Sequence, residues 1–277
     1  MFKNIKIFFF GIFQKTLEIL PASYACLLSN IRQIIMGRKI RFFYLKNHNL
    51  FKVESDRLTM FFNDKMRGFN TYSYGIKERA LSLADTYCLN LVKFSNDDVF
   101  IDCGANYGDL YAWTLVNKIK VNYISFEPSP EEYECIKLNC NGQINNNLAL
   151  SNKTGMSDFY LKSSSGDSSI IEPAKGFTKK IIIKTITLED YVVKNNIKKI
   201  KFFKLEAEGF EPEISQGAKN ILDRIEYIGV DGSPERGLKS EATIQQVTEF
   251  LENNNFKIIG SNINQFYSKA LFKNKNI

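Results

Sequence analysis

From Asn96 onward, short apolar runs alternate with segments of helical period, and this alternation limits the possible folds more than any other feature of the chain. An apolar run of about 4–8 residues before a helical segment is typical of a buried strand that leads into a crossover helix. Repetition of this unit predicts a parallel sheet with helices on both faces. Strands are expected at residues 99–103, 122–126, 145–151, 200–208 and 225–232, and helices at 108–117, 130–139, 187–196 and 211–222.

The end of the chain departs from the parallel pattern. Apolar runs at residues 256–261 and 265–272 are joined only by residues 262–264. A connection this short joins antiparallel strands, because a parallel pair needs a crossover of about a dozen residues. A helix capped by Ser240 is expected over 240–255. The sequence therefore predicts an α/β sheet that is mostly parallel, with one of its last two strands antiparallel.

The loop "DCGANYG", residues 102–108, follows the first of these strands. Open parallel sheets bind ligands beyond the carboxyl ends of their strands, so this loop is a candidate binding site. A dinucleotide-binding loop reads G-x-G-x-x-G, and its second glycine lets a pyrophosphate approach. Here Asn106 stands between Gly104 and Gly108, and Asp102 precedes them. A carboxylate at Asp102 repels a pyrophosphate and suits a cationic ligand; capping of the next helix is its alternative role.

Glu127 follows the second strand, about 20 residues after the glycine loop, in "ISFEPSP". A carboxylate at this place can accept two hydrogen bonds from a ribose diol. The alternative is a surface acid before a proline. Together with Asp102, Glu127 indicates a ligand with a ribose, a positive charge and no phosphate, and S-adenosylmethionine fits that description.

The chain resembles methyltransferases of the FkbM type over residues 96–260. The similarity rests on ordered sequence blocks, which are "DCGANYG", "FEPSPEEYECIKLN", "NNLALS", "GDSSI", "TITLEDY" and "FFKLEAEGFEPEISQGAKNIL". The resemblance implies the class I methyltransferase (Rossmann-like) fold, a seven-stranded sheet with one antiparallel strand. It also implies S-adenosylmethionine-dependent O-methylation, often of sugar hydroxyls in glycans or secondary metabolites.

The resemblance also assigns residues. Gly104, Asn106 and Gly108 match the family's cofactor loop, and Glu127 matches its ribose-binding acid. A further family block, of unassigned role, matches Gly166, Ser168 and Ser169. The family usually reads K-I-D-V-E-G-x-E where this chain has "KLEAEGFE", so Glu206 replaces an aspartate. The extra methylene displaces this carboxylate, and small displacements matter at a reacting centre.

"KLEAEGFE", residues 204–211, carries the candidate base. Glu206 and Glu208 are two residues apart, so in a continuing strand both side chains point to one face. Methyl transfer to a hydroxyl requires an aligned acceptor and removal of its proton, and paired carboxylates raise one another's pKa. The alternatives are that Glu206 binds loop amides and that Glu208 caps the next helix. Asp231, in "GVDGSPERG", is a further candidate for orientation or proton removal.

The net charge of +7 lies in the first 50 residues, which hold eight basic residues and one acid, Glu18. The rest of the chain sums to zero, so nucleic-acid binding is not expected. Residues 1–20 and 21–37 read as two helices, the second starting at Pro21 and ending at Gly37, and residues 38–70 read as short strands. The helices either cover the following domain or rest on anionic lipid.

Several classes of site are excluded. Five cysteines without a CxxC pair and one histidine, His48, argue against a metal site and against a histidine-based catalytic unit. The unpaired cysteines indicate a reducing compartment, and the apolar run at residues 7–13 is too short to span a bilayer. We therefore expect a cytoplasmic protein, with peripheral contact at the inner face of the membrane as an open alternative.

The sequence thus predicts a basic helical and β extension over residues 1–70 and an FkbM-type domain over 71–277. The leading hypothesis is an S-adenosylmethionine-dependent O-methyltransferase that acts on a sugar or glycan, free or lipid-linked. Two alternatives stay open: a dinucleotide-binding oxidoreductase with a variant glycine loop, and a non-catalytic membrane-associated protein that binds S-adenosylmethionine.

Overall fold

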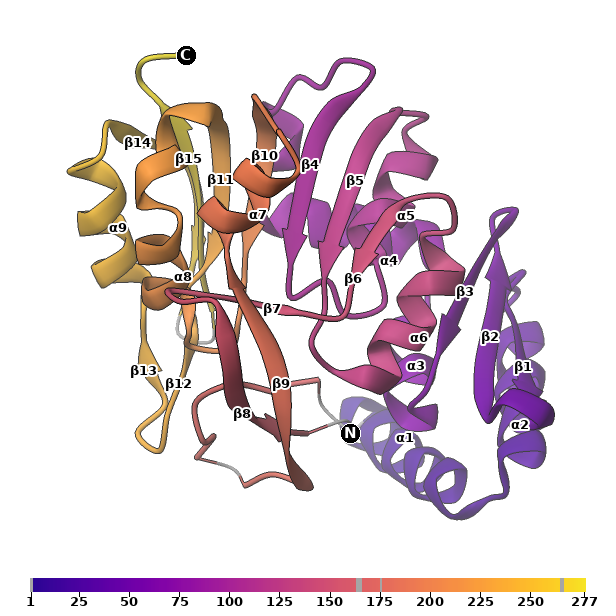
Figure 1. The fold of residues 1–277 in the computed structure, drawn as a ribbon. Coiled ribbons are helices and arrows are strands. Elements are labelled where there is room, and N and C mark those ends of the chain that lie inside the picture. Colours follow the sequence, from indigo (N-terminus) through magenta and orange to yellow (C-terminus); the bar gives the residue numbers. More distant parts are fainter. Residues whose placement is uncertain (1, 163–165, 175, 265–266) are drawn as a thin grey trace. The chain divides into compact units, whose positions relative to one another are not determined.

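A computed structural model describes residues 2–162, 166–174, 176–264 and 267–277, with side chains from Gly11 onward (Figure 1). The chain forms two compact units, Met1–Arg79 and Ala80–Ile277. The domain division at residues 70 and 71 stays a prediction.

The first unit combines helices with a small antiparallel sheet in the order β1-β2-β3. Pro21 precedes helix α2, and Gly37 follows it with a φ of +69°, as the sequence predicts. A cluster of phenylalanines forms the core, in which the rings of Phe42 and Phe69 lie 5.0 Å apart. The elements are α1 (Phe2–Ile19), α2 (Ala22–Ile35), β1 (Arg41–Leu45), β2 (Leu50–Ser55), β3 (Leu58–Phe62) and α3 (Lys65–Thr71), followed by α4 (Ile76–Thr86), which crosses the boundary between the units. Within the described ranges, none of the helices has the length and apolar content needed to cross a bilayer.

The second unit is built on a seven-stranded sheet in the order β14-β15-β11-β10-β4-β5-β6. β15 pairs antiparallel with both of its neighbours, and the other strands run parallel to one another, as the sequence predicts. This is the strand order and direction of the class I methyltransferase fold. The strands are β4 (Asp98–Cys103), β5 (Val121–Phe126), β6 (Ile144–Asn146), β10 (Ile200–Leu205), β11 (Ile225–Asp231), β14 (Phe256–Ile263) and β15 (Ser268–Asn274).

Helices cover both faces of this sheet because its central strands are apolar on both sides. Phe203 belongs to the cluster that packs under α7, α8 and α9. Its neighbour Phe202 points to the opposite face, where its ring lies 4.8 Å from that of Phe100. Figure 1 shows α7, α8 and α9 in front of the sheet and α5 behind it. The helices are α5 (Asp109–Val116), α6 (Pro130–Asn139), α7 (Leu188–Lys194), α8 (Glu211–Gly217) and α9 (Ile244–Glu252).

A three-stranded sheet, in the order β7-β9-β8, extends from the main one, with a hairpin of β12 (Pro234–Arg236) and β13 (Glu241–Ala242) beside it (Figure 1). Its strands are β7 (Ala149–Ser151), β8 (Gly155–Leu161) and β9 (Lys179–Thr187). The expected single strand over 145–151 is wrong, because β6 and β7 belong to different sheets. Asn147 lies between them and donates its side-chain amide to the carbonyl oxygens of Glu127 and Pro128.

Candidate functional site

The glycine loop leaves β4 in an unusual backbone conformation. Gly104, Asn106 and Gly108 all have left-handed φ angles, of +67°, +53° and +83°. A Cβ at Gly104 would lie 2.4 Å from the carbonyl oxygen of Glu206, and one at Gly108 would lie 2.5 Å from the sulfur of Cys140. Both glycines are therefore required by conformation and by close packing.

Glu127 fastens this loop to the end of β5. Its carboxylate is 7% exposed and accepts hydrogen bonds from the backbone N–H groups of Asn106, at 2.8 Å, and Ser129, at 2.9 Å. The structure thus brings together Asn106 and Glu127, which the sequence proposes for the same cofactor. Glu127 is a buried acid that holds the loop, so the surface-acid alternative is wrong.

The loop fits a cofactor that carries a ribose. The side-chain oxygen of Asn106 is buried and has no hydrogen-bond partner among the described residues. A carboxylate accepts up to about four hydrogen bonds, so Glu127 can bind the loop amides and also receive bonds from a pair of neighbouring hydroxyls. An orphaned acceptor beside a buried carboxylate suits a ligand that donates hydrogen bonds, as ribose does.

Asp102 lies beneath the loop and is 1% exposed. The ammonium group of Lys204 is 3.1 Å from its carboxylate, and the hydroxyl of Tyr123 donates to it. The following helix is capped by Gly108, so the helix-capping alternative for Asp102 is wrong. The cation that Asp102 binds belongs to the neighbouring strand, because the register of β4 and β10 places Asp102 opposite Lys204.

Lys204 connects the glycine loop to the next candidate site residue. Its ammonium group donates to the carbonyl oxygens of Gly104, at 2.7 Å, and Cys103, at 3.0 Å, and lies 2.7 Å from the carboxylate of Glu206. Burial opposes the charge, but Asp102 and Glu206 outweigh it and raise the pKa of Lys204. Lys204 is therefore a permanent cation beneath the site.

Glu206 is bound from two sides, by Lys204 and by the hydroxyl of Tyr87, which donates at 2.7 Å. Burial favours the neutral acid, but Lys204 and Lys269 outweigh it and hold the pKa of Glu206 well below its usual value. A carboxylate that stays ionised this firmly is a weak proton acceptor. Among the described residues, its side chain contacts Lys204 and Tyr87, and not the loop amides that the sequence offers as an alternative.

Asp231 ends β11 on the other side of Tyr87. Its buried carboxylate lies 2.7 Å from the ammonium group of Lys269 and accepts a hydrogen bond from the backbone N–H of Ser233 at 3.1 Å. Lys269 also donates to the hydroxyl of Tyr87 at 3.3 Å. Burial and the charge of Glu206 raise the pKa of Asp231 against the opposing effect of Lys269. Tyr87 and Lys269 thus join Glu206 to Asp231.

Glu208 lies in a different environment from Glu206. β10 ends at Leu205 and Glu208 has a φ of +52°, so the expectation of two carboxylates on one face of a continuing strand is wrong. The carboxylate of Glu211 causes the turn, because it accepts hydrogen bonds from the N–H groups of Ala207, at 2.8 Å, and Gly209, at 3.1 Å. Glu211, and not Glu208, therefore organises the start of α8.

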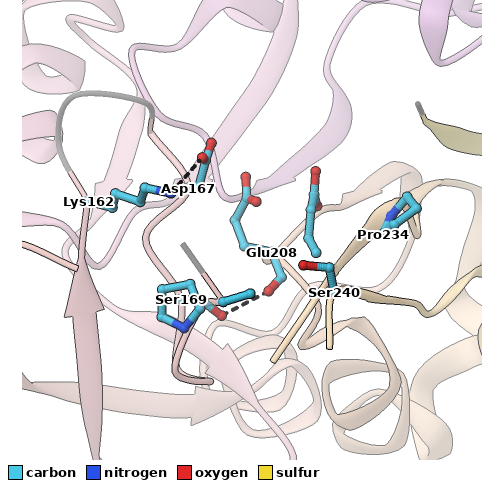
Figure 2. Close-up of a pocket in the computed structure, with 9 residues that line it drawn as sticks. Lys162, Asp167, Ser169, Glu208, Pro234 and Ser240 are labelled. Atoms are coloured by element: carbon cyan, nitrogen blue, oxygen red, sulfur yellow. Dashed lines mark hydrogen bonds and ion pairs between the residues drawn. The ribbon is translucent and has the colours of Figure 1, made fainter. Parts of the chain in front are cut away.

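The turn places Glu208 in a polar cavity of about 260 Å³. Figure 2 shows its side chain centrally among the labelled residues, between Asp167 and Ser240. Burial and the surrounding acids raise the pKa of Glu208 well above its usual value. The cavity is lined by Lys162, Asp167, Ser169, Pro173, Ala174, Glu208, Pro234, Glu235 and Ser240.

Of the block of Gly166, Ser168 and Ser169, Ser169 lines this cavity. The hydroxyl of Ser169 donates to the carbonyl oxygen of Glu208 at 2.9 Å (Figure 2). Ser168 accepts a hydrogen bond from the backbone N–H of Lys162 at 2.8 Å, and Gly166 has a left-handed φ of +83°. Ser169 therefore binds the backbone of the Glu208 turn, and Ser168 binds the backbone at the end of β8.

Sequence reasoning missed Tyr87, Lys162 and Lys269, which lie outside the motifs that mark the site, and also Glu235. Arg236, in the same "GVDGSPERG" segment as Asp231, forms a two-pronged ion pair with Glu213 through its guanidinium. Lys269 could have been found from strand pairing, because the antiparallel pairing of β15 with β11 places Lys269 opposite Asp231. Nothing in the local sequence marks Tyr87 or Glu235.

Comparison with known proteins gives a consistent family. The profile of the methyltransferase FkbM domain matches residues 102–258. Hexuronic acid methyltransferase AglP of Haloferax volcanii is 29% identical over 190 residues, which are 63% of this chain and 75% of that protein. M. capricolum TrmK, solved with S-adenosyl-homocysteine, has a TM-score of 0.40 and 15% identity, with 72% of this chain and 68% of that chain covered. Ribosomal protein L11 methylase of Lactobacillus delbrueckii subsp. bulgaricus has a TM-score of 0.40 and 11% identity, with 72% of this chain and 78% of that chain covered.

Proposed function

Because the chain belongs to the FkbM methyltransferase family, we propose that it transfers a methyl group from S-adenosylmethionine to a sugar hydroxyl. One observation carries this proposal. Gly104 of the glycine loop packs against the backbone of Glu206, two residues before Glu208. The segment from Glu206 to Glu208 is therefore a common wall between the cofactor loop and the polar cavity.

Asn106 and Glu127 are the residues that would hold the cofactor, through its ribose. Gly104 and Gly108 allow the loop to take its shape, and Asp102 supports the loop through Lys204. When bound, S-adenosylmethionine supplies an electrophilic methyl group, whose bond to sulfur breaks as the bond to the acceptor oxygen forms, with the electron pair left on sulfur.

The polar cavity suits an acceptor that is rich in hydroxyl groups. Hydroxyls of Ser169 and Ser240 and the charged groups of Lys162 and Asp167 line it. Side chains of this kind form several directional hydrogen bonds to a sugar. The similarity to a hexuronic acid methyltransferase supports the same class of acceptor.

Among the three candidate bases, Glu208 is the best suited. A sugar hydroxyl is a weak nucleophile, and a carboxylate of raised pKa accepts its proton more readily near neutral pH. Glu206 is held ionised by Lys204 and Tyr87, and Asp231 is paired with Lys269. We assign proton removal to Glu208. Glu206 and Asp231 orient Tyr87 and Lys269, to which they are bound.

Calorimetry and a transfer assay test this function. S-adenosylhomocysteine should bind to the protein and NADH should not, which separates a methyltransferase from an oxidoreductase. Isotopically labelled S-adenosylmethionine should then pass its methyl group to glucose- or glucuronate-terminated oligosaccharides. Binding of NADH without S-adenosylhomocysteine would refute the proposal, and cofactor binding without transfer to any sugar would favour the non-catalytic alternative.

We also propose that the first unit holds the enzyme at the cytoplasmic face of a membrane, close to a lipid-linked glycan. The apolar side chains of α2 support this. Its described buried residues are Ala25, Cys26, Ser29 and Gln33, which are small or polar. Five of its larger apolar side chains, Tyr24, Leu27, Ile31, Ile34 and Ile35, are exposed at helical spacing. The basic excess of residues 1–50 complements an anionic lipid surface.

A further inference from the structure

Glu235 lines the same cavity as Glu208 and comes from a different element. Glu208 belongs to the turn after β10, whereas Glu235 is the central residue of β12. The side chains of Glu235 and Glu208 line this cavity together and lie close enough to influence each other's ionisation. Two carboxyl groups form a hydrogen bond only when one of them carries a proton, because ionised carboxylates only accept.

The environment of Oε2 of Glu235 also favours a proton shared with Glu208. Oε2 of Glu235 is buried and has no hydrogen-bond partner among the described residues. The other buried acids of the site have donors: Asp231 has Lys269 and Ser233, and Glu211 has two backbone N–H groups and Thr243. A buried carboxylate without a donor is costly, and a proton held with Glu208 removes that cost.

The charges around the pair also favour retention of a proton. Asp167 faces it from the segment after β8 and is itself paired with Lys162, at 3.5 Å. Glu206 and Glu211 flank Glu208, and Asp231 precedes Glu235, with Lys269 as its counter-ion. Burial, with the charges of Asp231, Glu206 and Glu211, raises the pKa of Glu235 to about 8. Burial and the neighbouring acids, with Glu235 foremost among them, raise the pKa of Glu208 in the same direction.

We propose that Glu208 and Glu235 share one proton and act as a pair in methyl transfer, with Glu235 as the positioning residue that sets the basicity of Glu208. This inference rests on the proposed function. The pair begins with one proton and one negative charge. The acceptor hydroxyl gives its proton to the ionised carboxylate as its oxygen takes the methyl group, so that the pair then holds two protons. One of them leaves to solvent with the product.

Infrared titration of the protein without any substrate tests the pair directly. The C=O band of a protonated carboxyl group should persist to near-neutral pH, far above the ordinary range of glutamate. Glu208→Gln and Glu235→Gln should each remove the band of the pair, because each leaves a lone carboxylate with an amide donor beside it. Glu211 contributes a band common to all these proteins, which cancels in difference spectra. Exposed Glu252 provides the matched control, Glu252→Gln, which should leave the band unchanged.

A band that survives in Glu235→Gln would overturn the pair, since Glu208 would then hold its proton alone. Both variants conserve size, and binding of S-adenosylhomocysteine reports whether they are folded. The transfer assay supplies a second readout. In Glu235→Gln the rise of kcat with pH should move to higher pH, because the proton of Glu235 no longer stabilises the ionised carboxylate of Glu208.

The two readouts separate the inference from the function on which it rests. A shared-proton band in a protein that methylates no sugar would leave the pair standing and refute its role in methyl transfer, together with the proposed function. Methyl transfer by a protein without that band, or with an unmoved pH profile in Glu235→Gln, would uphold the function and refute the pair.

Discussion

Gly104 and Glu206 are in contact across neighbouring strands, so close that a Cβ on Gly104 would stand 2.4 Å from the carbonyl oxygen of Glu206. This contact joins the loop proposed to hold the cofactor to the turn that carries Glu208. Lys204 reinforces it, since its ammonium group binds both the carbonyl oxygen of Gly104 and the carboxylate of Glu206. Binding and chemistry therefore depend on one shared segment of backbone.

The first prediction concerns that contact. Gly104→Ala should displace the Glu206 turn and weaken binding of S-adenosylhomocysteine by more than tenfold, measured by calorimetry. A left-handed φ alone costs a non-glycine residue about 1–2 kcal/mol. Gly142→Ala is the matched control, because Gly142 has a φ of +80° and nothing within 4 Å of the added Cβ. Equal binding by the two variants would show that the contact is unimportant.

The second prediction concerns Glu127. Glu127→Ala removes the acceptor of two backbone N–H groups and of the proposed ribose bonds, each worth about 1–3 kcal/mol when a buried partner is left unsatisfied. The affinity for S-adenosylhomocysteine should fall by roughly tenfold or more. Glu134→Ala, at an exposed position of α6, should bind normally. Unchanged affinity in Glu127→Ala would refute its assignment to the cofactor.

The third prediction concerns stability and pH. Burial raises the pKa of Glu211 from 4.5 to about 7, against the opposing effect of its hydrogen bonds. Between these values the folded protein holds a proton that the unfolded chain releases, so the free energy of unfolding falls as pH rises through this range. The loss attributable to Glu211 is about 3 kcal/mol.

Glu211→Gln keeps a hydrogen-bond acceptor and a donor for the same partners, but its side-chain amide does not titrate. Urea unfolding at pH 5 and pH 8 should show a smaller loss of stability in this variant than in the wild type, while Glu252→Gln should behave as the wild type. The same pH dependence in all three proteins would contradict a protonated Glu211.

The fourth prediction concerns the membrane. Replacing Leu27 and Ile34 by serine removes two side chains that are more than half exposed, and each contributes about 1–2 kcal/mol when buried in lipid. Sedimentation with anionic vesicles should fall at least tenfold, whereas neutral vesicles should bind little of either protein. The matched control replaces Met156 and Ile182, which are equally exposed in the second unit. Equal loss in the control pair would rule out α2 as the docking surface.

Local signals were enough to predict most of the second unit. The strand–helix alternation gives the parallel sheet, and the short link after Ile263 requires the antiparallel β15. The proximity of Asn106 and Glu127 could also be predicted from the sequence, because the two residues follow adjacent strands. Helix boundaries that depend on a distant partner could not be predicted in this way. α9 begins at Ile244 and not at Ser240, and Thr243 before it donates to the carboxylate of Glu211.

Dependence on partners that are distant in the chain also explains which parts of the site could not be predicted from the sequence. Tyr87 and Glu206 are 119 residues apart in the chain, and no periodicity relates them. Glu208 was expected beside Glu206 from their spacing, which holds only while a strand continues. The left-handed turn at Glu208 depends on hydrogen bonds to the buried Glu211, and it redirects Glu208 toward Glu235.

The central claim is that the protein methylates a sugar hydroxyl and that Glu208 takes the proton. Mass spectrometry of glycans from cells that produce the wild type, Glu208→Gln or Glu252→Gln tests it most directly. We expect sugar methyl ethers with the wild type and the Glu252 variant. The Glu208 variant should reduce them by roughly 100-fold or more, although the purified variant binds S-adenosylhomocysteine normally. Equal methylation in all three cells, with equal amounts of protein, would contradict the account.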